Sequence, residues 1–289
     1  MPSRARRIAR RAAFRVATSD GVERAALGVR PLRGLAFQHA QRYVAGLDEH
    51  AALAVAQSLG REGLSASIDL FGENVEEVGW AEAETERYLA LAATVQAGTY
   101  VSLDCSHLGL DADPVECRDR VRRIATALPA GSRLQLGAEE SRRTEAILGL
   151  ARGLAGEGLP LMATVQANLR RSARDVEELA GAGIPVRLVK GAYVEAPELA
   201  LAWGPATDRA FVALAERLAA LGAEHALATH DPAILRRLAP AGSIEFLLGV
   251  RAADARRLAR EGHRVRIYVP YGRRWFRYYA RRVAESIGA

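Results

Sequence analysis

Cysteine and long apolar runs are scarce in this sequence. Its 289 residues include only two cysteines, Cys105 and Cys117, and no uninterrupted run of 18 apolar residues. Two isolated cysteines exclude a disulfide scaffold and favour a reducing compartment, and the missing apolar run argues against a membrane-spanning helix. The first 17 residues are basic but lack the apolar centre of a secretion signal, so we expect a cytoplasmic protein.

Motifs of several common site types are also missing. The sequence contains no P-loop, no HExxH pair and no CxxC, which excludes the usual phosphate cradles and zinc sites, and we predict no metal. The segment Gly181-Ala-Gly183 lacks the third glycine of a dinucleotide fingerprint and precedes a predicted strand instead of following one. Any catalysis must therefore depend on another kind of site.

Lysine is almost absent, because the 40 basic residues include the single lysine Lys190. In a chain that uses arginine elsewhere, this lysine indicates a position that needs a compact ammonium group; the alternative is drift in an arginine-rich composition. Six arginines lie in residues 1–15, and without them the formal charge of +6 falls to about zero. We therefore predict no nucleic-acid partner, and interpret the basic start as a solvated helix or, alternatively, a contact with anionic lipid.

Short β-branched or apolar runs alternate with amphipathic segments along most of the chain. Parallel strands joined by helices follow from this alternation, and eight units without a second-domain signal favour a (βα)8 barrel. We expect a helical N-terminal extension at residues 1–60 and a single barrel domain at 61–289. The expected strands are residues 66–71, 99–104, 133–136, 161–166, 185–190, 225–230, 243–248 and 265–269.

Polar side chains stand at or near the carboxyl ends of these predicted strands. In a (βα)8 barrel, chemistry takes place at that end and in the loops that follow it. The residues concerned are Asp104, Gln166, Lys190, Thr229, His230, Glu245 and Tyr268.

The last helix predicted, after residue 272, carries an unusual mixture of side chains. Trp275, Tyr278, Arg282 and Glu285 recur at helical spacing, with Arg281 adjacent to them. Adjacent arginines over a barrel mouth would hold a small carboxylate, and aromatic rings would wall the site. The alternative is a solvated C-terminal helix whose arginines complement its dipole.

Several motifs, in order over about residues 35–285, resemble the proline dehydrogenase family of flavoenzymes. They are Arg187-Leu-Val-Lys190-Gly-Ala-Tyr193, Ala228-Thr-His230-Asp231, Glu245-Phe-Leu-Leu-Gly-Val250, Val265-Arg-Ile-Tyr268-Val-Pro-Tyr-Gly272, and Tyr278 followed by Arg281, Arg282 and Glu285. The resemblance implies a distorted (βα)8 barrel that binds FAD noncovalently and oxidises L-proline, or a similar imino or amino acid, to an imine by hydride transfer to flavin N5.

The resemblance also implies roles for individual residues. Arg187 would be catalytic, near flavin N5, and Arg281 and Arg282 would hold the substrate carboxylate. The substrate ring would lie between Tyr268, Tyr278 and Leu247. The cofactor would be bound by Gln166, Arg187, Val189, Lys190, Gly191, Thr229, His230, Ala138 and Glu285. Family members often pass electrons to a membrane quinone, which implies a quinone acceptor and peripheral membrane contact through the basic N-terminus.

Two positions depart from the family pattern. Asp104 stands where the family has a lysine of the carboxylate clamp, and Gly137 stands where it has an aspartate. A carboxylate beside the substrate carboxylate would weaken proline binding. We therefore expect Asp104 to act in catalysis and substrate binding, in a pocket for an amino acid with a larger or cationic substituent. The alternatives are a catalytically impaired flavin or metabolite binder and an unrelated (βα)8 enzyme without flavin.

Overall fold

The protein was analysed as a computed structural model, which describes residues 21, 28, 30–72 and 78–287. The basic segment at residues 1–15 lies outside the described residues, so its predicted contacts with solvent or lipid stay predictions. None of the helices among the described residues is long and apolar enough to cross a membrane.

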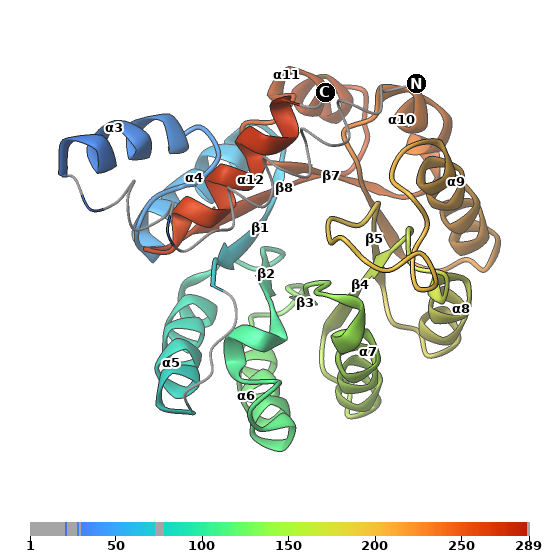
Figure 1. The fold of residues 1–289 in the computed structure, drawn as a ribbon, viewed down its shortest axis with the longest axis horizontal. Coiled ribbons are helices and arrows are strands. Elements are labelled where there is room, and N and C mark those ends of the chain that lie inside the picture. Colours follow the sequence, from blue (N-terminus) through green and yellow to red (C-terminus); the bar gives the residue numbers. More distant parts are fainter. Residues whose placement is uncertain (1–20, 22–27, 29, 73–77, 288–289) are drawn as a thin grey trace.

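Eight parallel strands close into one barrel in sequence order, which confirms the predicted fold (Figure 1). Six predicted strands are correct to within one residue at each end, the sixth ends two residues early and the eighth continues for two more. The strands are β1 (Ser65–Leu70), β2 (Tyr100–Leu103), β3 (Leu134–Leu136), β4 (Leu161–Gln166), β5 (Val186–Val189), β6 (His225–Ala228), β7 (Ser243–Leu247) and β8 (Val265–Tyr271).

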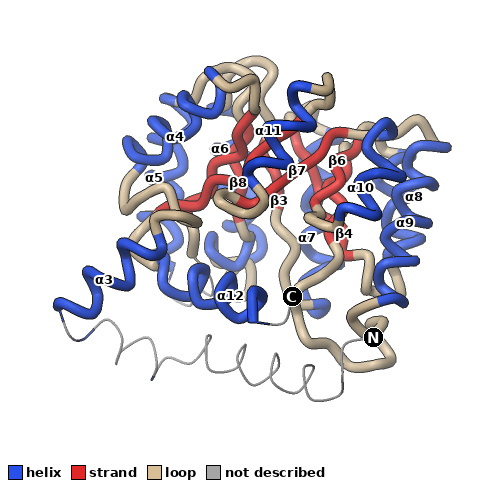
Figure 2. The backbone as a smooth tube through the Cα atoms, turned by 90° about the horizontal axis from the view of Figure 1, so that it is seen from above, coloured by secondary structure: helices blue, strands red, loops and turns tan. Residues whose placement is uncertain are grey.

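Helices surround the barrel, one after each strand, as Figure 2 shows from above. They are α5 (Val78–Thr94), α6 (Pro114–Ala127), α7 (Ser141–Gly156), α8 (Ser172–Gly181), α9 (Pro205–Ala220), α10 (Pro232–Leu238), α11 (Ala252–Arg260) and α12 (Trp275–Ile287), with short 3-10 turns η1 (Cys105–Leu108) and η2 (Ala239–Ala241). Aspartates begin two of them: Asp113 and Asp231 accept hydrogen bonds from the first backbone N–H groups of α6 and α10, each with proline as the next residue.

Two described helices precede the barrel, α3 (Arg30–Ala40) and α4 (Glu49–Arg61). Helix α4 packs against β1 and β8, whereas α3 lies beside α12. The division of the chain at residue 60 stays a prediction.

The inside and outside of the barrel differ in chemistry because side chains alternate along each strand. On β2, Val101 and Leu103 belong to the main apolar core, whereas the Tyr100 ring lies 3.3 Å from the guanidinium carbon of Arg266 inside the barrel. The interiors of such barrels are usually filled by branched aliphatic residues. A polar interior here places charged groups directly beneath the strand ends.

Candidate active site

A buried ion pair joins two strands inside the barrel. Arg187 on β5 donates a hydrogen bond from Nε to Glu245 on β7 at 2.5 Å, and the two side chains are only 12% and 1% exposed. Gln135 on β3, with its amide oriented to satisfy both groups, donates to Glu245 at 3.3 Å and accepts from Arg187 at 3.1 Å. Burial alone would lower the pKa of the Arg187 guanidinium, but the charge and hydrogen bond of Glu245, together with Tyr268 and Asp69, outweigh burial, so the net pKa is raised. Arg187 is therefore a fixed cation.

Two tyrosines hold a carboxylate at the end of β1. The Tyr268 hydroxyl donates to Asp69, and the Tyr88 hydroxyl donates to the Leu70 carbonyl at 3.0 Å and to Asp69 at 3.4 Å. Burial, and then the charge of Asp69, raise the pKa of Tyr268 well above its usual value, so the phenol stays a donor. The guanidinium carbon of Arg187 lies 5.6 Å from the Tyr268 ring, which connects this group to the ion pair.

The terminal helix α12 adds aromatic and basic side chains to the same region. The Tyr278 ring lies 6.1 Å from that of Tyr268 and meets Phe71, just after β1, edge-on at 5.3 Å. The guanidinium carbon of Arg281 lies 5.9 Å from the Phe71 ring, and that of Arg282 lies 5.1 Å from the Tyr278 ring. Both arginines are half-buried. Their position argues against a wholly solvated helix.

One residue of the predicted helical stripe has a different neighbourhood. Trp275 is 1% exposed and packs against Phe37 of α3, with ring centroids 5.1 Å apart. It anchors α12 to α3, whereas Tyr278 is the aromatic residue of the stripe whose ring meets Tyr268. Glu285 lies within α12, but its side chain is outside the described residues, and its predicted role is untested.

The single lysine bridges two helices. The Lys190 ammonium group donates to Asp208, in the first turn of α9, at 2.6 Å and to Asp231, the N-cap of α10, at 3.2 Å. Burial raises the pKa of Asp231, but backbone N–H groups of α10 and Lys190 outweigh it, so the net pKa is lowered. A compact ammonium group with several donors suits two carboxylates from different directions.

His230 follows β6 and lies at the carboxyl end of the barrel. Its imidazole ring is neutral near pH 7. Its Nε2 accepts a hydrogen bond from the Leu247 backbone N–H at 3.0 Å, and its ring meets Phe246 edge-on at 5.5 Å. Burial, and then the nearby cations beginning with Arg282, lower its pKa to about 4. The neighbouring Thr229 hydroxyl accepts from the Asp231 backbone N–H at 3.2 Å.

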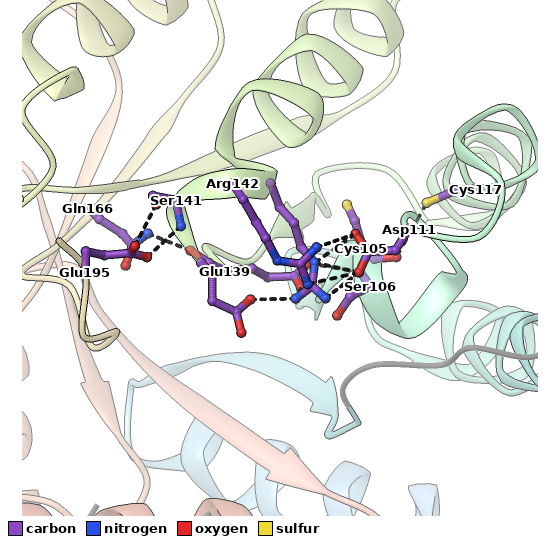
Figure 3. A network of polar contacts seen from close by, with 11 residues as sticks. Cys105, Ser106, Asp111, Cys117, Glu139, Ser141, Arg142, Gln166 and Glu195 are labelled. Atoms are coloured by element: carbon purple, nitrogen blue, oxygen red, sulfur yellow. Dashed lines mark hydrogen bonds and ion pairs between the residues drawn. The ribbon is translucent and has the colours of Figure 1, made fainter. Parts of the chain in front are cut away.

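A hydrogen-bonded network supports the β3 and β4 side of the mouth (Figure 3). Gln166 donates from Nε2 to the Glu139 carbonyl at 2.8 Å, and the Glu139 carboxylate accepts from the Ser106 N–H at 2.9 Å. Glu195, in the loop after β5, accepts from the N–H and hydroxyl of Ser141 at 2.7 and 2.6 Å. These contacts fix the loops from β3 and β5 around the end of β4.

Tight packing accompanies the turn after β5. At Gly191, where φ is +102°, a Cβ atom would lie 1.9 Å from Oδ1 of Asn168, so glycine is required there. Val189 is the last residue of β5, Leu247 is the last residue of β7, and Ala138 follows β3. All three residues are half-buried. Most of the predicted cofactor positions fall on loops or strand ends at one end of the barrel: Gln166, Val189, Lys190, Gly191, Thr229, His230 and Ala138. Arg187 is instead the second residue of β5, and Glu285 belongs to α12.

Asp104 and Gly137 meet at the ends of β2 and β3. A Cβ atom on Gly137 would lie 1.9 Å from Oδ1 and 3.1 Å from Cγ of Asp104. The two departures from the family pattern are therefore in direct contact, and the Asp104 side chain occupies the space that any larger residue at 137 would need.

Sequence reasoning missed four polar groups of this region: Asp69, Gln135, Asp208 and Tyr88. The alternation along β1, with Ser67 and Asp69 on one face, contained a signal for Asp69. No signal marked Asp208, because its helix reaches Lys190 only in the folded barrel.

Comparisons with known proteins agree with this geometry. The family model for proline dehydrogenase matches residues 52–288. Proline dehydrogenase 1 of Bacillus subtilis subsp. natto is 32% identical over 260 residues, covering 85% of this chain and 86% of that protein. Proline dehydrogenase of Deinococcus radiodurans is 32% identical over 266 residues, covering 86% of each chain.

A solved structure shares the fold. Proline utilization A from Bdellovibrio bacteriovorus superposes with a TM-score of 0.79 at 20% identity over 98% of this chain. This chain spans 36% of that longer protein, so the likeness concerns the barrel. The family match and the two relatives show that the chain belongs to the proline dehydrogenase family.

Proposed function

We propose that this protein is an FAD-dependent dehydrogenase that oxidises the C–N bond of L-proline, or of a proline-like imino acid, to an imine at the carboxyl end of the barrel. Family membership supports the reaction class. The observation that carries the assignment to this end is the continuous contact from Glu245 through Arg187, Tyr268 and Tyr278 to Arg282. It joins a cation inside the barrel to the arginines of α12.

The described residues fit a flavin at this end. The Thr164 hydroxyl on β4 and Oδ1 of Asn168, after β4, are buried and lack a hydrogen-bond partner within the described part of the chain. They lie near Gln166 and Gly191, two of the positions proposed for cofactor binding. Lys190, Thr229 and His230 follow β5 and β6 on the same side. A fixed cation such as Arg187 or Lys190 favours the negative charge of a reduced flavin.

The reaction removes a hydride from carbon and a proton from nitrogen, which leaves a C=N bond. Bound FAD supplies the hydride acceptor. Arg281 and Arg282 would hold the substrate carboxylate, since paired guanidinium groups bind carboxylates with fixed geometry. Tyr268, Tyr278 and Leu247 would enclose the ring and exclude water. His230 would stay neutral and add no further positive charge.

A quinone as electron acceptor and peripheral membrane contact remain proposals from the family resemblance. The basic segment that would make this contact lies outside the described residues, and binding to anionic vesicles would test it.

The visible spectrum of the purified protein, followed by anaerobic titration with L-proline, tests the function. We expect a flavin spectrum that bleaches on addition of L-proline, with the imine product trapped by an aromatic amino-aldehyde. A colourless protein that takes up no added FAD would contradict cofactor binding. A coloured protein that no imino acid bleaches would instead favour a flavin-binding homologue without this activity.

A further inference from the structure

We propose that the groove between α10 and α11, on the outside of the barrel, binds a medium-chain carboxylate, that is, an apolar chain ending in one anionic group. The proposal goes beyond the proposed function and does not depend on it, because none of the residues that line the groove is a predicted substrate or cofactor position.

Salt bridges join neighbouring outer helices around most of the barrel. The bridges are Arg123–Glu82 between α6 and α5, Arg122 of α6 with Glu157 at the end of α7, Arg152–Glu178 between α7 and α8, Arg217–Glu177 between α9 and α8, Arg237–Glu216 between α10 and α9, and Arg256 of α11 with Glu62 at the end of α4. Within the described part of the chain, no such bridge crosses from α10 to α11, which are neighbours in Figure 1, or from α4 to α5.

Both of these unbridged junctions contain a cavity. The cavity between α10 and α11 has a volume of about 410 Å³, whereas the one between α4 and α5 has about 220 Å³. Small-molecule sites usually have volumes of roughly 300–1,000 Å³, so the first is the better candidate. Its floor is formed by Leu235 and Ala239 of α10 and Leu258 of α11, each no more than 6% exposed. An apolar chain is favoured on this floor because it leaves water.

The groove follows the length of α11. Residues that line it extend from Arg251, the N-cap of this helix, to Glu261, its C-cap, a distance of about 15 Å at a rise of 1.5 Å per residue. This shape suits an extended chain better than a compact ring. Arg251 is also the one non-glycine residue among those described with a positive φ, +50°, and backbone strain of this kind clusters at ligand-binding sites.

The charges around the groove favour a single anionic group. Arg257 pairs with Glu261 at 2.7 Å and Arg251 pairs with Asp254 at 2.6 Å, so two arginines are matched by two carboxylates. Arg236, exposed on α10, forms no ion pair with any described residue. One positive charge is therefore left uncompensated, and a planar guanidinium matches a carboxylate. A neutral or cationic chain would lack this partner.

Isothermal titration of the FAD-loaded protein with decanoate, below its micelle-forming concentration, tests the proposal. We expect saturable binding of decanoate, weaker binding of 1-decanol and the weakest binding of decylamine. Arg236→Gln should weaken decanoate binding roughly fivefold, as expected for an exposed charge pair, and leave 1-decanol binding unchanged. The matched control is Arg237→Gln, at the adjacent arginine that pairs with Glu216 of α9; it should bind decanoate as the wild type does.

Absence of saturable decanoate binding in the wild type would overturn the proposal. Equal losses in Arg236→Gln and Arg237→Gln would do the same, because they would indicate an effect of surface charge alone. A loss in Arg282→Ala with none in Arg236→Gln would place decanoate at the barrel mouth instead. Light scattering of the same samples distinguishes a second copy of this chain, since a dimer that decanoate dissociates would assign the groove to the partner chain and overturn the proposal.

The same variants separate this site from the proposed function. Arg236→Gln should leave kcat/KM for L-proline unchanged. A wild-type flavin that L-proline does not bleach would therefore contradict the proposed function, whereas decanoate binding would still decide the groove.

Discussion

The two sides of the barrel mouth hold their charged side chains in different ways. On the β1 and β2 side, Asp69 accepts hydrogen bonds from two tyrosine hydroxyls, and the Asp104 side chain packs directly against Gly137. On the β5 and β6 side, Arg187 and Lys190 are held by carboxylates from β7, α9 and α10. On the first side, called the acidic side here, the contacts named are hydroxyl donors and close packing; on the second, called the basic side for Arg187 and Lys190, they are ion pairs. Disturbing the basic side should therefore affect folding first, whereas disturbing the acidic side should affect selectivity first.

The largest effect expected is on the buried ion pair. Glu245→Ala should lower the free energy of unfolding by about 3–5 kcal/mol, because it leaves the Arg187 cation buried without its carboxylate. Denaturant unfolding measures this. The matched control is Glu216→Ala, whose partner Arg237 is 62% exposed; it should cost about 0–1 kcal/mol. Equal losses in the two variants would show that the interior pair is no more important than a surface one.

Stability should also depend on pH, through a buried histidine on each side. His107, whose pKa burial lowers to about 3, lies on the β2 side, and His230, whose pKa is about 4, lies on the β6 side. Because the unfolded chain binds these protons near pH 6.5 and the folded protein does not, stability should fall as the pH drops from about 6.5 toward 4.

His230→Asn should remove part of that slope, about 3 kcal/mol over the window by linkage. Asparagine was chosen because it can still accept the Leu247 N–H. Unfolding curves between pH 4 and 8, compared with those of His50→Asn at an exposed position of α4, would measure the difference. An unchanged slope in His230→Asn would mean that this ring does not stay neutral.

The α12 arginines should affect substrate binding more than folding. Arg282→Ala should lower kcat/KM for L-proline roughly 100-fold if it removes a charge-assisted contact to the substrate carboxylate. Arg260→Ala, at the exposed end of α11, is the control and should leave kcat/KM unchanged. A loss confined to thermal stability would place Arg282 in helix packing instead.

Sequence alone predicted the barrel well and the site in part. Strands such as residues 161–166 were recovered without error because an apolar run with β-branched residues, bounded by turns, leaves few alternatives. The motif around Arg187 and Lys190 was found, but its partners were not, because Asp208 and Gln135 come from distant elements that only barrel closure brings near. The packing of Trp275 on α3 was missed since helical spacing alone does not identify which neighbour covers a face.

The smallest effect expected is at Lys190, and it tests whether the basic side depends on ion pairs even at its exposed edge. Lys190→Met leaves Asp208 and Asp231 facing each other without the cation between them, yet all three side chains are about one-third exposed, so water screens the repulsion. The expected loss is at most about 1 kcal/mol in unfolding free energy. The separate double variant Asp208→Asn/Asp231→Asn keeps the ammonium group and removes both acids, so it distinguishes the need for a cation from the need for a bridge. If Lys190→Met weakens FAD binding while the double variant does not, the cation itself serves the cofactor; if both weaken it equally, the bridge between α9 and α10 is what the single lysine provides.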